Sequence, residues 1–426
     1  MTTTKNNEHK KLNFSSEREQ SQACLNSAEH EKNQGRKVLN VPNLRFPEFQ
    51  GEWEESTIGE EFDLYSGNTP SRLNKEHFNG AINWISSGEL KEHYIADTKE
   101  KISDEAAKTL KMLPIGTFVI AIYGLEADGV RGTGSITKTE ATISQACMAF
   151  ISKGKVQNEF LYSWYKKHGN VIGIRYAQGT KQQNLSYDII EKFKIAYPTF
   201  QEQENLNKFI ALLDERIATQ NKIIEDLKKL KSAIIEIEYT PNTKTTSHIG
   251  NVIEQISKRN KNNAIQNVLS VSNRQGFIKQ SDQFENRNVA SEDTSNYKIV
   301  EKNDFAFNPA RINVGSIARL TTFEKGIISP MYICFRTQEN VAPEYIDFFF
   351  ESKHFYCEIQ KRLEGSVRQC LSFEGLCNIP FSLPSLEMQQ RIGKRLFTLG
   401  QKIKTETDLL ELLNKQKQYL LRQMFI

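Results

Sequence analysis

Four consecutive residues, Asn308-Pro309-Ala310-Arg311, are the part of this sequence that comes nearest to a catalytic motif. Adenine methyltransferases carry Asn-Pro-Pro followed by an aromatic residue, which stacks on a base flipped out of the duplex. Here Arg311 stands where the aromatic ring is needed. The Gly-rich run from Gly129 to Gly134 is expected in a loop between strands and not before a helix, as a cofactor-binding turn would require. The pattern therefore does not support intrinsic methyl transfer.

A second candidate for chemistry is acidic. Glu344, followed by Glu351-Ser352-Lys353, resembles the acidic residue and Glu-x-Lys of metal-dependent nucleases, whose carboxylates must converge on Mg²⁺. The segment EYIDFFFESKHF is typical of one amphipathic helix, on which Glu344 and Glu351 would share a face. The same charges can equally form the solvent side of that helix. A Mg²⁺-dependent endonuclease therefore remains an alternative function.

Cysteine and histidine are dispersed along the chain. There is no Cys-x-x-Cys pair, and none of the seven histidines stands at metal-ligand spacing. We expect reduced, mostly buried thiols and no metal or cofactor bound by this chain. Phosphate-binding loops and Ser-His-Asp arrangements are not evident either. The six cysteines are Cys24, Cys147, Cys334, Cys357, Cys370 and Cys377.

The composition is that of an ordinary soluble protein with two to four domains. Of the 426 residues, 38% are hydrophobic and 25% are charged, and the net charge is +4. The sequence contains no apolar run long enough to cross a bilayer, and its start, MTTTKNNEHKK, lacks the apolar core of a secretory signal. We therefore expect a cytoplasmic protein. So mild a charge does not by itself indicate a nucleic-acid binder, because a clustered basic face matters more than the total.

The elements that would position any site are repeated within the chain. When the sequence is shifted by 186 residues, GTKQQNLSYDIIEKFKIAYPTFQEQ from Gly179 lies without gaps over GSVRQCLSFEGLCNIPFSLPSLEMQ from Gly365. Hydrophobic or aromatic positions coincide between the identical ones. The identical pairs include Gly179/Gly365, Gln183/Gln369, Leu185/Leu371, Ser186/Ser372 and Pro198/Pro384.

Both copies of the repeat lead into a long segment with heptad spacing of apolar residues. Such a seam, held over four heptads, predicts a long helix that pairs in a coiled coil. Pro198 and Pro384 lie at or just before the predicted helix starts, where the missing N–H of proline costs nothing. The first seam is Leu206, Ile210, Leu213, Ile217, Gln220, Ile224, Leu227, Lys231 and Ile234, and the second is Ile392, Leu396, Leu399, Ile403, Glu406, Leu410, Leu413, Lys417 and Leu420.

The polar interruptions of the two seams fall at the same heptad steps. This favours pairing of the two helices with each other over two unrelated amphipathic helices that each dock on their own domain. In an antiparallel, pseudo-symmetric pair, Gln220 would lie near Glu406, and the two side chains would share a hydrogen bond in the middle of the seam.

Before each helix, short apolar runs alternate with Gly, Asn, Thr and Ser turns, which predicts two compact α/β domains with many short strands. The two domains are looser copies of each other, because Ile58-Gly59 corresponds to Ile249-Gly250, Gly134-Ser135-Ile136 to Gly315-Ser316-Ile317, and Phe160-Leu161 to Tyr345-Ile346. The expected fold class is α+β, with two α/β domains separated by two long antiparallel coiled-coil helices in a pseudo-twofold internal repeat. The expected parts are a disordered polar extension (1–40), domain 1 (41–197), helix 1 (198–239), domain 2 (240–383) and helix 2 (384–426).

Two similar domains held apart by stiff helices would bind an extended partner at two points, and double-stranded DNA is such a partner. A helix pair of roughly 50 Å suits two half-sites about one helical turn, ~34 Å, apart with a short unread spacer. Because the domains have diverged, the combined site would be asymmetric. A bivalent scaffold that binds no DNA remains an alternative, and salt-dependent DNA binding would separate the two.

Eight motifs follow one another along the chain. They are Leu44–Phe49 (LRFPEF), Gly67–Ser71 (GNTPS), Asn83–Leu90 (NWISSGEL), Gly116–Ala121 (GTFVIA), Ile143–Cys147 (ISQAC), Leu269–Ser272 (LSVS), Phe307–Ile317 (FNPARINVGSI) and Gly326–Tyr332 (GIISPMY). Together, and in this order, they resemble the specificity (S) subunit of type I restriction-modification systems, the HsdS family, from about residue 40 to the end. The polar extension before them departs from the usual start of that family.

The resemblance implies a sequence-specific DNA-binding subunit for phage defence that has no catalytic site of its own. Each target recognition domain would read one half of a bipartite site, and the helices would set the spacer. The implied partners are double-stranded DNA, two methyltransferase (M) subunits and restriction/translocase (R) subunits. S-adenosylmethionine, ATP and Mg²⁺ are expected on those partner subunits. The helix ends and the motifs at Gly179 and Gly365 would serve the junction with them more than the DNA.

Side chains that read bases must reach base edges, and Arg, Lys, Asn and Gln do so, whereas Lys, Ser and Thr mostly anchor phosphates. We expect these side chains in Gly-rich or polar loops. Arg311 and Asn313 are the first choice, because NPARINVG places polar groups between two apolar strands. The full set of candidates is Arg72, Lys75, Tyr123, Arg131 and Lys138 in the first domain, and Arg274, Gln275, Lys279, Arg311, Asn313 and Arg319 in the second.

Overall fold

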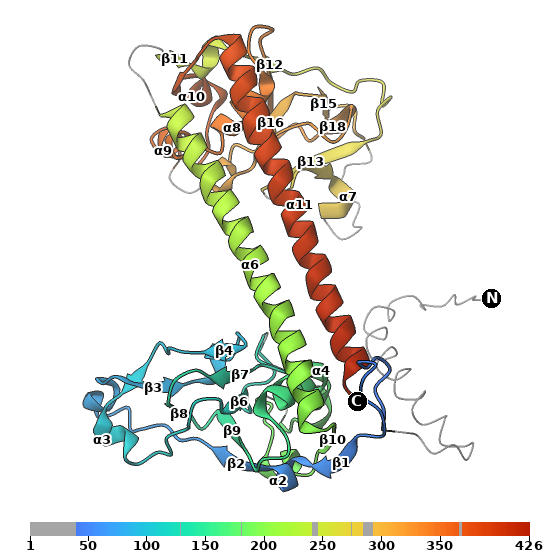
Figure 1. The fold of residues 1–426 in the computed structure, drawn as a ribbon. Helices are drawn as coiled ribbons and strands as arrows, with labels where there is room; N and C mark the ends of the chain where they lie inside the picture. The colour runs from blue at the N-terminus through green and yellow to red at the C-terminus, as the bar shows by residue number, and fades with distance from the viewer. Residues whose placement is uncertain are drawn as a thin grey trace, which may run out of the picture. The chain divides into compact units, whose positions relative to one another are not determined.

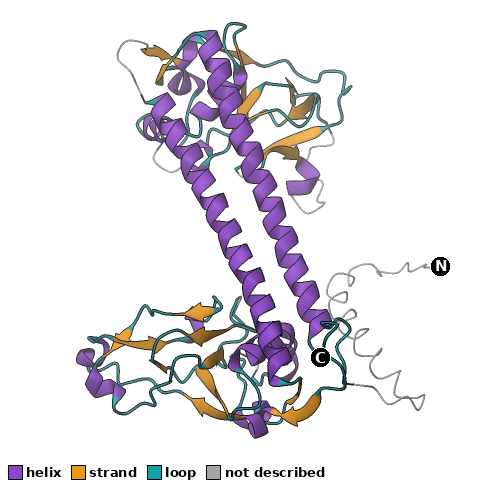
Figure 2. Ribbon diagram, viewed as in Figure 1, coloured by secondary structure: helices purple, strands orange, loops and turns teal. Residues whose placement is uncertain are grey.

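The computed structural model describes residues 40–127, 129–179, 181–240, 246–273, 275–283, 293–365 and 369–426. Apart from Asn40, the predicted N-terminal extension lies outside these residues, as do Cys24 and Arg274. The chain divides into two compact units. The first contains the residues up to Glu215 together with Asn414–Ile426, and the second contains Arg216–Leu413. Within the described ranges, the helices are all too short or too polar to cross a membrane. Both units combine helices with strands (Figure 2).

The first unit is built on a five-stranded sheet of order β2-β9-β6-β7-β4, a three-stranded sheet of order β5-β3-β8 and the ladder β1-β10 (Figure 1). The strands are β1 (Glu54–Thr57), β2 (Phe62–Ser66), β3 (Ile82–Ile85), β4 (Tyr94–Ile95), β5 (Lys101–Ile102), β6 (Phe118–Ala121), β7 (Gly134–Thr137), β8 (Ala141–Ile143), β9 (Cys147–Ser152) and β10 (Lys194–Tyr197). The helices before residue 198 are α2 (Ile58–Glu61), α3 (Asp104–Ala107), α4 (Asn158–Tyr176) and α5 (Tyr187–Ile190). All four residues of β6, the middle strand of this sheet, are buried.

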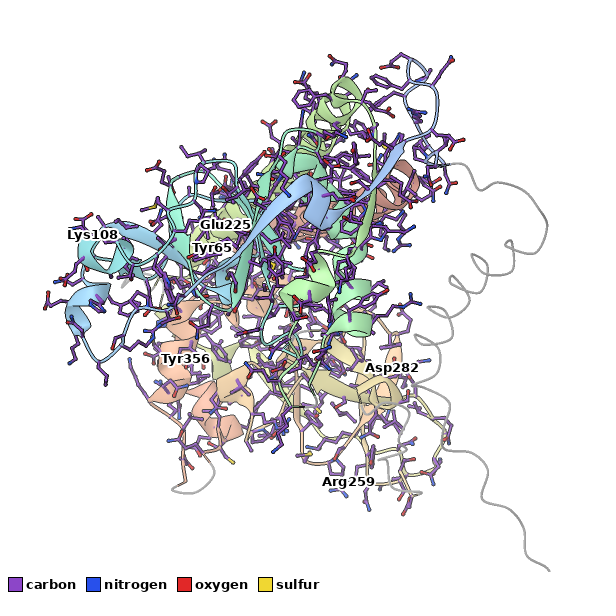
Figure 3. The ribbon with its side chains drawn as sticks, turned by 90° about the horizontal axis from the view of Figure 1, so that it is seen from below. Tyr65, Lys108, Glu225, Arg259, Asp282 and Tyr356 are labelled. Atoms are coloured by element: carbon purple, nitrogen blue, oxygen red, sulfur yellow. The ribbon has the colours of Figure 1, made fainter. Side chains whose placement is uncertain are left out.

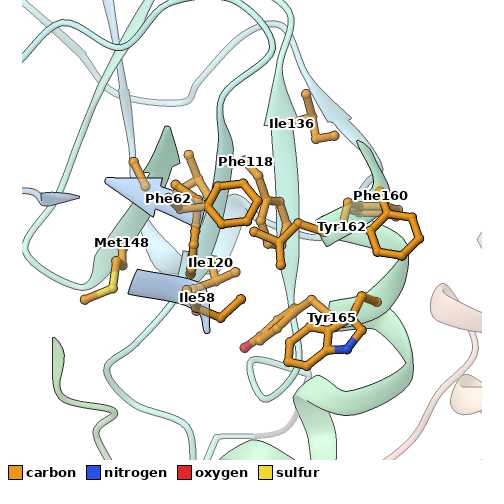
Figure 4. Close-up of a cluster of buried hydrophobic side chains, with 14 of the residues drawn as sticks. Ile58, Phe62, Phe118, Ile120, Ile136, Met148, Phe160, Tyr162 and Tyr165 are labelled. Atoms are coloured by element: carbon orange, nitrogen blue, oxygen red, sulfur yellow. The ribbon is translucent and has the colours of Figure 1, made fainter. Parts of the chain in front are cut away.

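The core of the first unit lies where α4 packs on this sheet, and aromatic side chains fill it (Figure 4). The ring of Phe118 on β6 meets the edge of Tyr162 on α4 at a centroid distance of 6.0 Å and lies 5.4 Å from Phe150 on β9. Edge-to-face pairs of this kind stabilise by about 1 kcal/mol beyond the burial of their area. The sheet and the helix are therefore held as one body from which the loops project.

The second unit contains two four-stranded sheets, β12-β19-β16-β17 and β14-β13-β18-β15, and the ladder β11-β20. The strands are β11 (Thr246–His248), β12 (Ile253–Ile256), β13 (Val268–Ser272), β14 (Gly276–Lys279), β15 (Lys298–Glu301), β16 (Phe305–Phe307), β17 (Ile317–Arg319), β18 (Lys325–Ile328), β19 (Ile333–Thr337) and β20 (Pro380–Ser382). The short helices are α7 (Gln280–Gln283), α8 (Pro343–Phe349), α9 (Lys353–Gln360) and α10 (Phe373–Cys377). Phe305 stacks on Phe335 at 5.1 Å in its core.

The two units share one topology, which confirms the predicted α+β class with an internal repeat. The order β2-β9-β6-β7 corresponds to β12-β19-β16-β17, and β5-β3-β8 corresponds to β14-β13-β18. In these smaller strand groups, the pairs β3·β8 and β13·β18 are parallel. The pairs β3·β5 and β13·β14 are antiparallel. The divergence is therefore confined to the connections and to a few added strands.

Strand register corrects one of the predicted correspondences. Ile136 lies opposite Phe118, whereas Arg319 lies opposite the equivalent Phe305. The triplet Gly134-Ser135-Ile136 therefore corresponds to Ile317-Ala318-Arg319 and not to Gly315-Ser316-Ile317. The sequence match misled because the connections before β7 and β17 differ in length, which moves an identical triplet to a different place in the ladder.

The correspondence of Ile58-Gly59 with Ile249-Gly250 agrees with the packing. A Cβ built on Gly59 would lie 3.1 Å from Glu191, and one built on Gly250 would lie 2.8 Å from Cys377. Glu191 and Cys377 are themselves related by the 186-residue shift of the repeat. Because each glycine lacks a side chain, the end of the short helix α5 or α10 can pack against it at the equivalent point of each unit.

Two long helices, α6 (Phe200–Tyr239) and α11 (Leu386–Met424), each contribute to both units. Their exposure follows the predicted heptads, because every seam residue is buried or half-buried. The ends of the seams serve the domain cores, with Leu206 and Ile210 in the core of the first unit and Ile392 and Leu396 in that of the second. The other predicted seam residues are Leu213, Ile217, Gln220, Ile224, Leu227, Lys231, Ile234, Leu399, Ile403, Glu406, Leu410, Leu413, Lys417 and Leu420.

The predicted hydrogen bond in the middle of the seam is present. Gln220 is buried, and its Nε2 donates to Glu406 Oε2 at 2.6 Å and to the Glu406 carbonyl at 2.9 Å. Arg395, before Glu406 in α11, pairs at 3.5 Å with Glu238, after Gln220 in α6. Within the second unit the two helices therefore run antiparallel.

The segment LRFPEF binds the long helices within the first unit. Arg45 forms a bidentate ion pair with the buried Glu202 of α6, with both N–O distances 2.7 Å, and the ring of Phe46 lies 5.9 Å from that of Phe209. The backbone N–H of Leu44 donates to the carbonyl of Gln423 in α11. This motif is therefore structural, joining the entry to the first domain to both helices.

The prediction of mostly buried thiols holds for only part of the set. Among the described cysteines, Cys147 and Cys334 are buried, and burial raises the pKa of each thiol to about 12. Cys370 and Cys377 are half-buried and Cys357 is exposed. All five are reduced.

Candidate nucleic-acid interface

The connection between β2 and β3 carries two of the predicted DNA-contacting residues of the first domain. Arg72 is 57% exposed and forms a bidentate ion pair with Glu100 at 2.8 and 2.9 Å. Its guanidinium also lies over the rings of Phe78 and Trp84. Lys75, at the start of the short helical turn Lys75–Phe78, is exposed. The connection is thus held in place by Arg72, and Lys75 is its more available cation.

Tyr123 and Arg131 both lie in the connection between β6 and β7, in which Tyr123 is exposed and Arg131 half-buried. The aliphatic part of Arg131 packs on Gly173 of α4, where an added Cβ would lie 2.5 Å from Arg131 Cγ. Its guanidinium donates to Gln183 Oε1 at 3.0 Å. Arg131 therefore also positions this loop, whereas Tyr123 presents its ring to solvent.

Lys138, directly after β7, is exposed, and its Nζ lies 4.4 Å from the centre of the Tyr94 ring. Its backbone N–H donates to the Ile95 carbonyl. A cation over an aromatic face keeps its charge while its orientation is fixed. The geometry is compatible with a phosphate contact.

In the second domain, the predicted residues come from two neighbouring hairpins. Gln275 lies in the turn between β13 and β14, and Lys279 ends β14; both are exposed. A Cβ on Gly276 would lie 3.5 Å from Ala318 of β17, and Ser316 Oγ donates to the Val271 carbonyl of β13. The two hairpins are therefore in contact.

Arg311 and Asn313 lie in a tightly bonded loop between β16 and β17, as the sequence predicted. The Asn308 side chain accepts from the Ala310 N–H, and the Arg311 carbonyl accepts from the N–H groups of Val314 and Ser316. Arg311 is exposed and Asn313 half-buried. Because its turn is bonded internally, this loop presents the Arg311 guanidinium from a fixed frame.

Arg319 requires a correction. Its side chain is only 7% exposed, and it pairs with Glu344 and, at 3.1 Å, with Asp347, both on α8. Asp347 keeps a pKa raised to about 6 by burial, although Arg319 acts in the opposite direction. The guanidinium is thus committed to fastening β17 to α8, and we remove Arg319 from the DNA-contacting set. In the sequence it resembles its neighbours, because burial cannot be inferred from residue type.

The acidic nuclease pattern is also corrected. The segment predicted as one helix is two, α8 and α9, separated at Phe350–Ser352, with the Ser352 side chain capping α9. Glu344 pairs with Arg319, whereas Glu351 pairs with Lys231 of α6 at 2.6 Å. The two carboxylates therefore do not converge on a common point. Among the described residues, no group of three or more His, Cys, Asp or Glu is placed to hold a metal ion.

The repeated glycine motifs support the loops that carry the candidates. Gly179 and Gly365 both have positive φ, 110° and 104°, and the equivalent bridges Gln178↔Asn184 and Glu364↔Cys370 close the loops after them. The N–H of Leu185 donates to Ile122 in the β6–β7 connection, and that of Leu371 donates to Pro309 in the β16–β17 connection. Their predicted role at a partner junction stays a prediction.

Sequence reasoning missed one pair of equivalent residues, Gln203 and Gln389. Each is almost fully buried at the start of a long helix. Gln203 bonds the Pro198 carbonyl and the N–H of Gln157 before α4, and Gln389 bonds the Pro384 carbonyl and the N–H of Ala342 before α8. Their identity at the 186-residue shift was the available signal.

Sequence reasoning also missed a cluster of basic residues in the second domain. Lys258, Arg259 and Lys261, in the connection between β12 and β13, are exposed and line an open groove. The signal was a stretch from Gln255 to Ser281 that contains five cations and no acidic residue.

A charged cluster links the first domain to the long helices within the first unit. His93 stacks between Tyr94 and Tyr162, and its Nε2 and Nδ1 lie 2.8 and 3.2 Å from Glu159 and Asp214. Asp214 of α6 also pairs with Lys417 of α11. Burial alone would lower the pKa of His93, but the two carboxylates outweigh it and raise the pKa. The cluster therefore favours a charged imidazole.

Comparison with known proteins adds to this geometry. A model of the type I restriction modification DNA specificity domain matches residues 50–229 and 234–415. The chain is 30% identical over 192 residues to the EcoR124I/EcoR124II specificity subunit of Escherichia coli, covering 44% of this chain and 46% of that one. It is 22% identical over 408 residues to the MjaVIII specificity subunit of Methanocaldococcus jannaschii, covering 88% and 90%. The first match thus spans about half the length of the relative.

Among solved structures, the type I restriction-modification S subunit from M. genitalium aligns with a TM-score of 0.56 over 91% of this chain and 99% of that one. At 16% sequence identity, this likeness shows the fold. The family model covers well over half of the chain in two segments, in agreement with the repeated topology. The chain therefore belongs to the family of type I restriction modification DNA specificity domain proteins.

Proposed function

We propose that this chain is the DNA-recognition subunit of a type I restriction-modification complex. Each of its two domains reads one half of an asymmetric bipartite site. The observation that carries the proposal is the match of two successive DNA specificity domains to one chain whose units share a strand order and differ in their loops. Because base reading depends on loop side chains, a conserved scaffold with divergent loops fits two different half-sites.

In this proposal α6 and α11 set the number of unread base pairs between the half-sites. The support is their continuity over 40 and 39 residues and the buried Gln220–Glu406 bond, which fixes their register within the second unit. A mismatched buried amide costs stability, so a polar pair in a seam selects one alignment over others.

The proposed partners are two methyltransferase subunits and the restriction/translocase subunits, in the cytoplasm where the DNA is. The support within this chain is an apolar stripe on α6 in the second unit, where Ile223, Leu230 and Ile237 recur every seven residues and are 40%, 51% and 75% exposed. Such a stripe suits a helical partner. S-adenosylmethionine, ATP and Mg²⁺ would bind to those partners, and this chain would supply no catalytic group.

The proposal is tested by coexpressing the chain with a methyltransferase subunit encoded beside it and mapping methylated adenines across the host genome. We expect methylation at one asymmetric bipartite sequence, and none when the methyltransferase is expressed alone. Methylation that is independent of this chain would contradict the proposal. Mg²⁺-dependent cleavage of DNA by the isolated chain would contradict the assignment of catalysis to partners.

A further inference from the structure

The connection between β12 and β13 in the second domain forms one wall of an open groove of about 740 Å³. Lys258, Arg259 and Lys261 belong to this wall, and Lys325 of β18 also lines the groove. Arg259 lies at the outer edge of the second unit (Figure 3). Three exposed cations within four residues, beside a concave surface, are the electrostatic footprint of a polyanion site.

The positive charges of the wall are only partly compensated, because Lys258 lies close enough to the Glu301 carboxyl to help lower its pKa. Arg259 donates to the neutral Asn296 side chain at 2.8 Å. Within the described residues, none of Lys258, Arg259 and Lys261 forms an ion pair with a carboxylate. Lys325 is less available, because its Nζ lies 2.9 Å from Glu301. The wall of the β12–β13 connection therefore carries the positive potential.

The wall is also rigid. Asn260 is 2% exposed, and its side chain both donates to the Ile265 carbonyl and accepts from the Ile265 N–H, which closes the turn. The backbone N–H of Asn260 donates to the Tyr297 carbonyl, and the Lys258 carbonyl accepts from the backbone N–H of Ile299 in β15. A frame fixed in this way places cations without the entropy cost of ordering a loop on binding.

The equivalent connection of the first domain, between β2 and β3, is different. It holds two cations, and one of them, Arg72, is neutralised by Glu100 through two hydrogen bonds. It also contains an acidic residue, Glu76. The repeat has thus produced a basic anchor in one domain and a largely neutralised loop in the other.

We propose that Lys258, Arg259 and Lys261 form a phosphate-backbone anchor for double-stranded DNA. This inference rests on the proposed function and extends it to a site that holds the DNA without reading its sequence. Phosphate contacts fix the position of a protein on the duplex, whereas base contacts select the sequence.

The test compares the full chain with the triple variant K258Q/R259Q/K261Q, both coexpressed with the methyltransferase subunit, in binding a labelled duplex over a range of salt concentrations. Each phosphate contact contributes about 0.9 to the slope of log K against log salt, so we expect the slope to fall by about 2 to 3. At ~0.1 M salt the affinity should fall on the order of a hundredfold. The methylated sequence should stay the same.

The matched control is K353Q/K394Q/K404Q, which removes the same charge from exposed positions of the second unit. Its slope should change by less than about 1. An unchanged slope in the groove variant, or an equal change in the control, would overturn the inference. If the groove triple variant does not fold, K261Q alone should lower the slope by about 0.9, and no change would again overturn the inference. Absence of salt-dependent DNA binding by the unaltered chain would instead overturn the proposed function.

Discussion

Two arginines eight residues apart in the second domain have opposite tasks. Arg311 is exposed on an internally bonded loop, whereas Arg319 is buried between Glu344 and Asp347. We predict that Arg311→Ala lowers DNA affinity by about 1–3 kcal/mol and leaves the free energy of unfolding unchanged. Arg319→Ala should lower the free energy of unfolding by roughly 2 kcal/mol, because it leaves a partly buried Asp347 without its partner. DNA titration and urea unfolding of both variants check this, and a stable Arg311→Ala protein with full affinity would rule out the contact.

The buried amide of Gln220 provides a second test at the scale of single residues. Gln220→Ala should lower the free energy of unfolding by about 1 kcal/mol, because the carbonyl and carboxylate of Glu406 lose their donor. The exposed Lys222→Ala on the same helix is the matched control. A double-mutant cycle of Gln220→Ala with Glu406→Ala should give a positive coupling in urea unfolding. Additive effects would mean that the pair contributes nothing to the seam.

At the scale of elements, two histidines of the first domain, His93 and His168, have pKa values that are shifted in opposite directions. The pKa of His93 is raised above its ordinary 6.5 by Asp214 and Glu159 despite burial. Its contribution to stability is therefore complete below pH 6.5 and is lost as the pH rises through the folded pKa. On α4, burial lowers the pKa of His168 to about 4. Its contribution is complete above pH 6.5 and is lost as the pH falls toward 4.

These opposite pKa shifts predict opposite pH dependences of stability for two matched variants. The difference in unfolding free energy between the unaltered chain and His93→Gln should shrink as the pH rises from 6 to 8. The difference for His168→Gln should instead shrink as the pH falls from 7 to 4. Urea unfolding at fixed ionic strength, read by tryptophan fluorescence, measures both. The same sign of pH dependence in the two variants would contradict the assigned environments.

The end of α11 is held by α4 of the first unit. Phe425 is 1% exposed and its ring lies 5.2 Å from that of Phe160, while Lys167 donates to the Phe425 carbonyl. We predict that Phe425→Ala lowers the free energy of unfolding by about 3 kcal/mol. Tyr419→Ala, at a position 58% exposed on α11, which ends one residue before Phe425, should change it by less than ~0.5 kcal/mol. Equal effects of the two substitutions in chemical denaturation would refute the docking of this end.

At the scale of the whole molecule, the repeat predicts that the two domains read independently. Exchange of residues 41–197 for the corresponding segment of a relative should change one half of the methylated site and leave the other half intact. The donor segment should keep residues equivalent to His93 and Phe160, because His93 pairs with Asp214 of α6 and Phe160 contacts Phe425 directly after α11. Genome-wide mapping of methylated adenines reads the result. A change in both halves would show that the domains do not read separately.

Much of this architecture could be predicted, because periodicity and repetition are properties of the chain itself. The heptads gave the two long helices, and the 186-residue shift related the motifs at Gly179 and Gly365, since spacing alone decides which residues share a helical face. The hydrogen bond of Gln220 with Glu406 followed from register. The motif resemblance, confirmed by the family match, supplied the family assignment.

The tertiary structure decided what spacing cannot express, namely which side chains remain available. Arg319 and Arg311 have the same chemistry, yet only the fold places two carboxylates of α8 beside one of them. The single helix predicted over Glu344 and Glu351 became two, because the Ser352 side chain caps a new helix there. The sequence shows that the stretch around Lys258 lacks acidic residues. Only the structure shows that the Asn260 side chain fixes the connection that carries these cations. Burial and pairing depend on contacts between residues far apart in the chain, and these only the folded molecule defines.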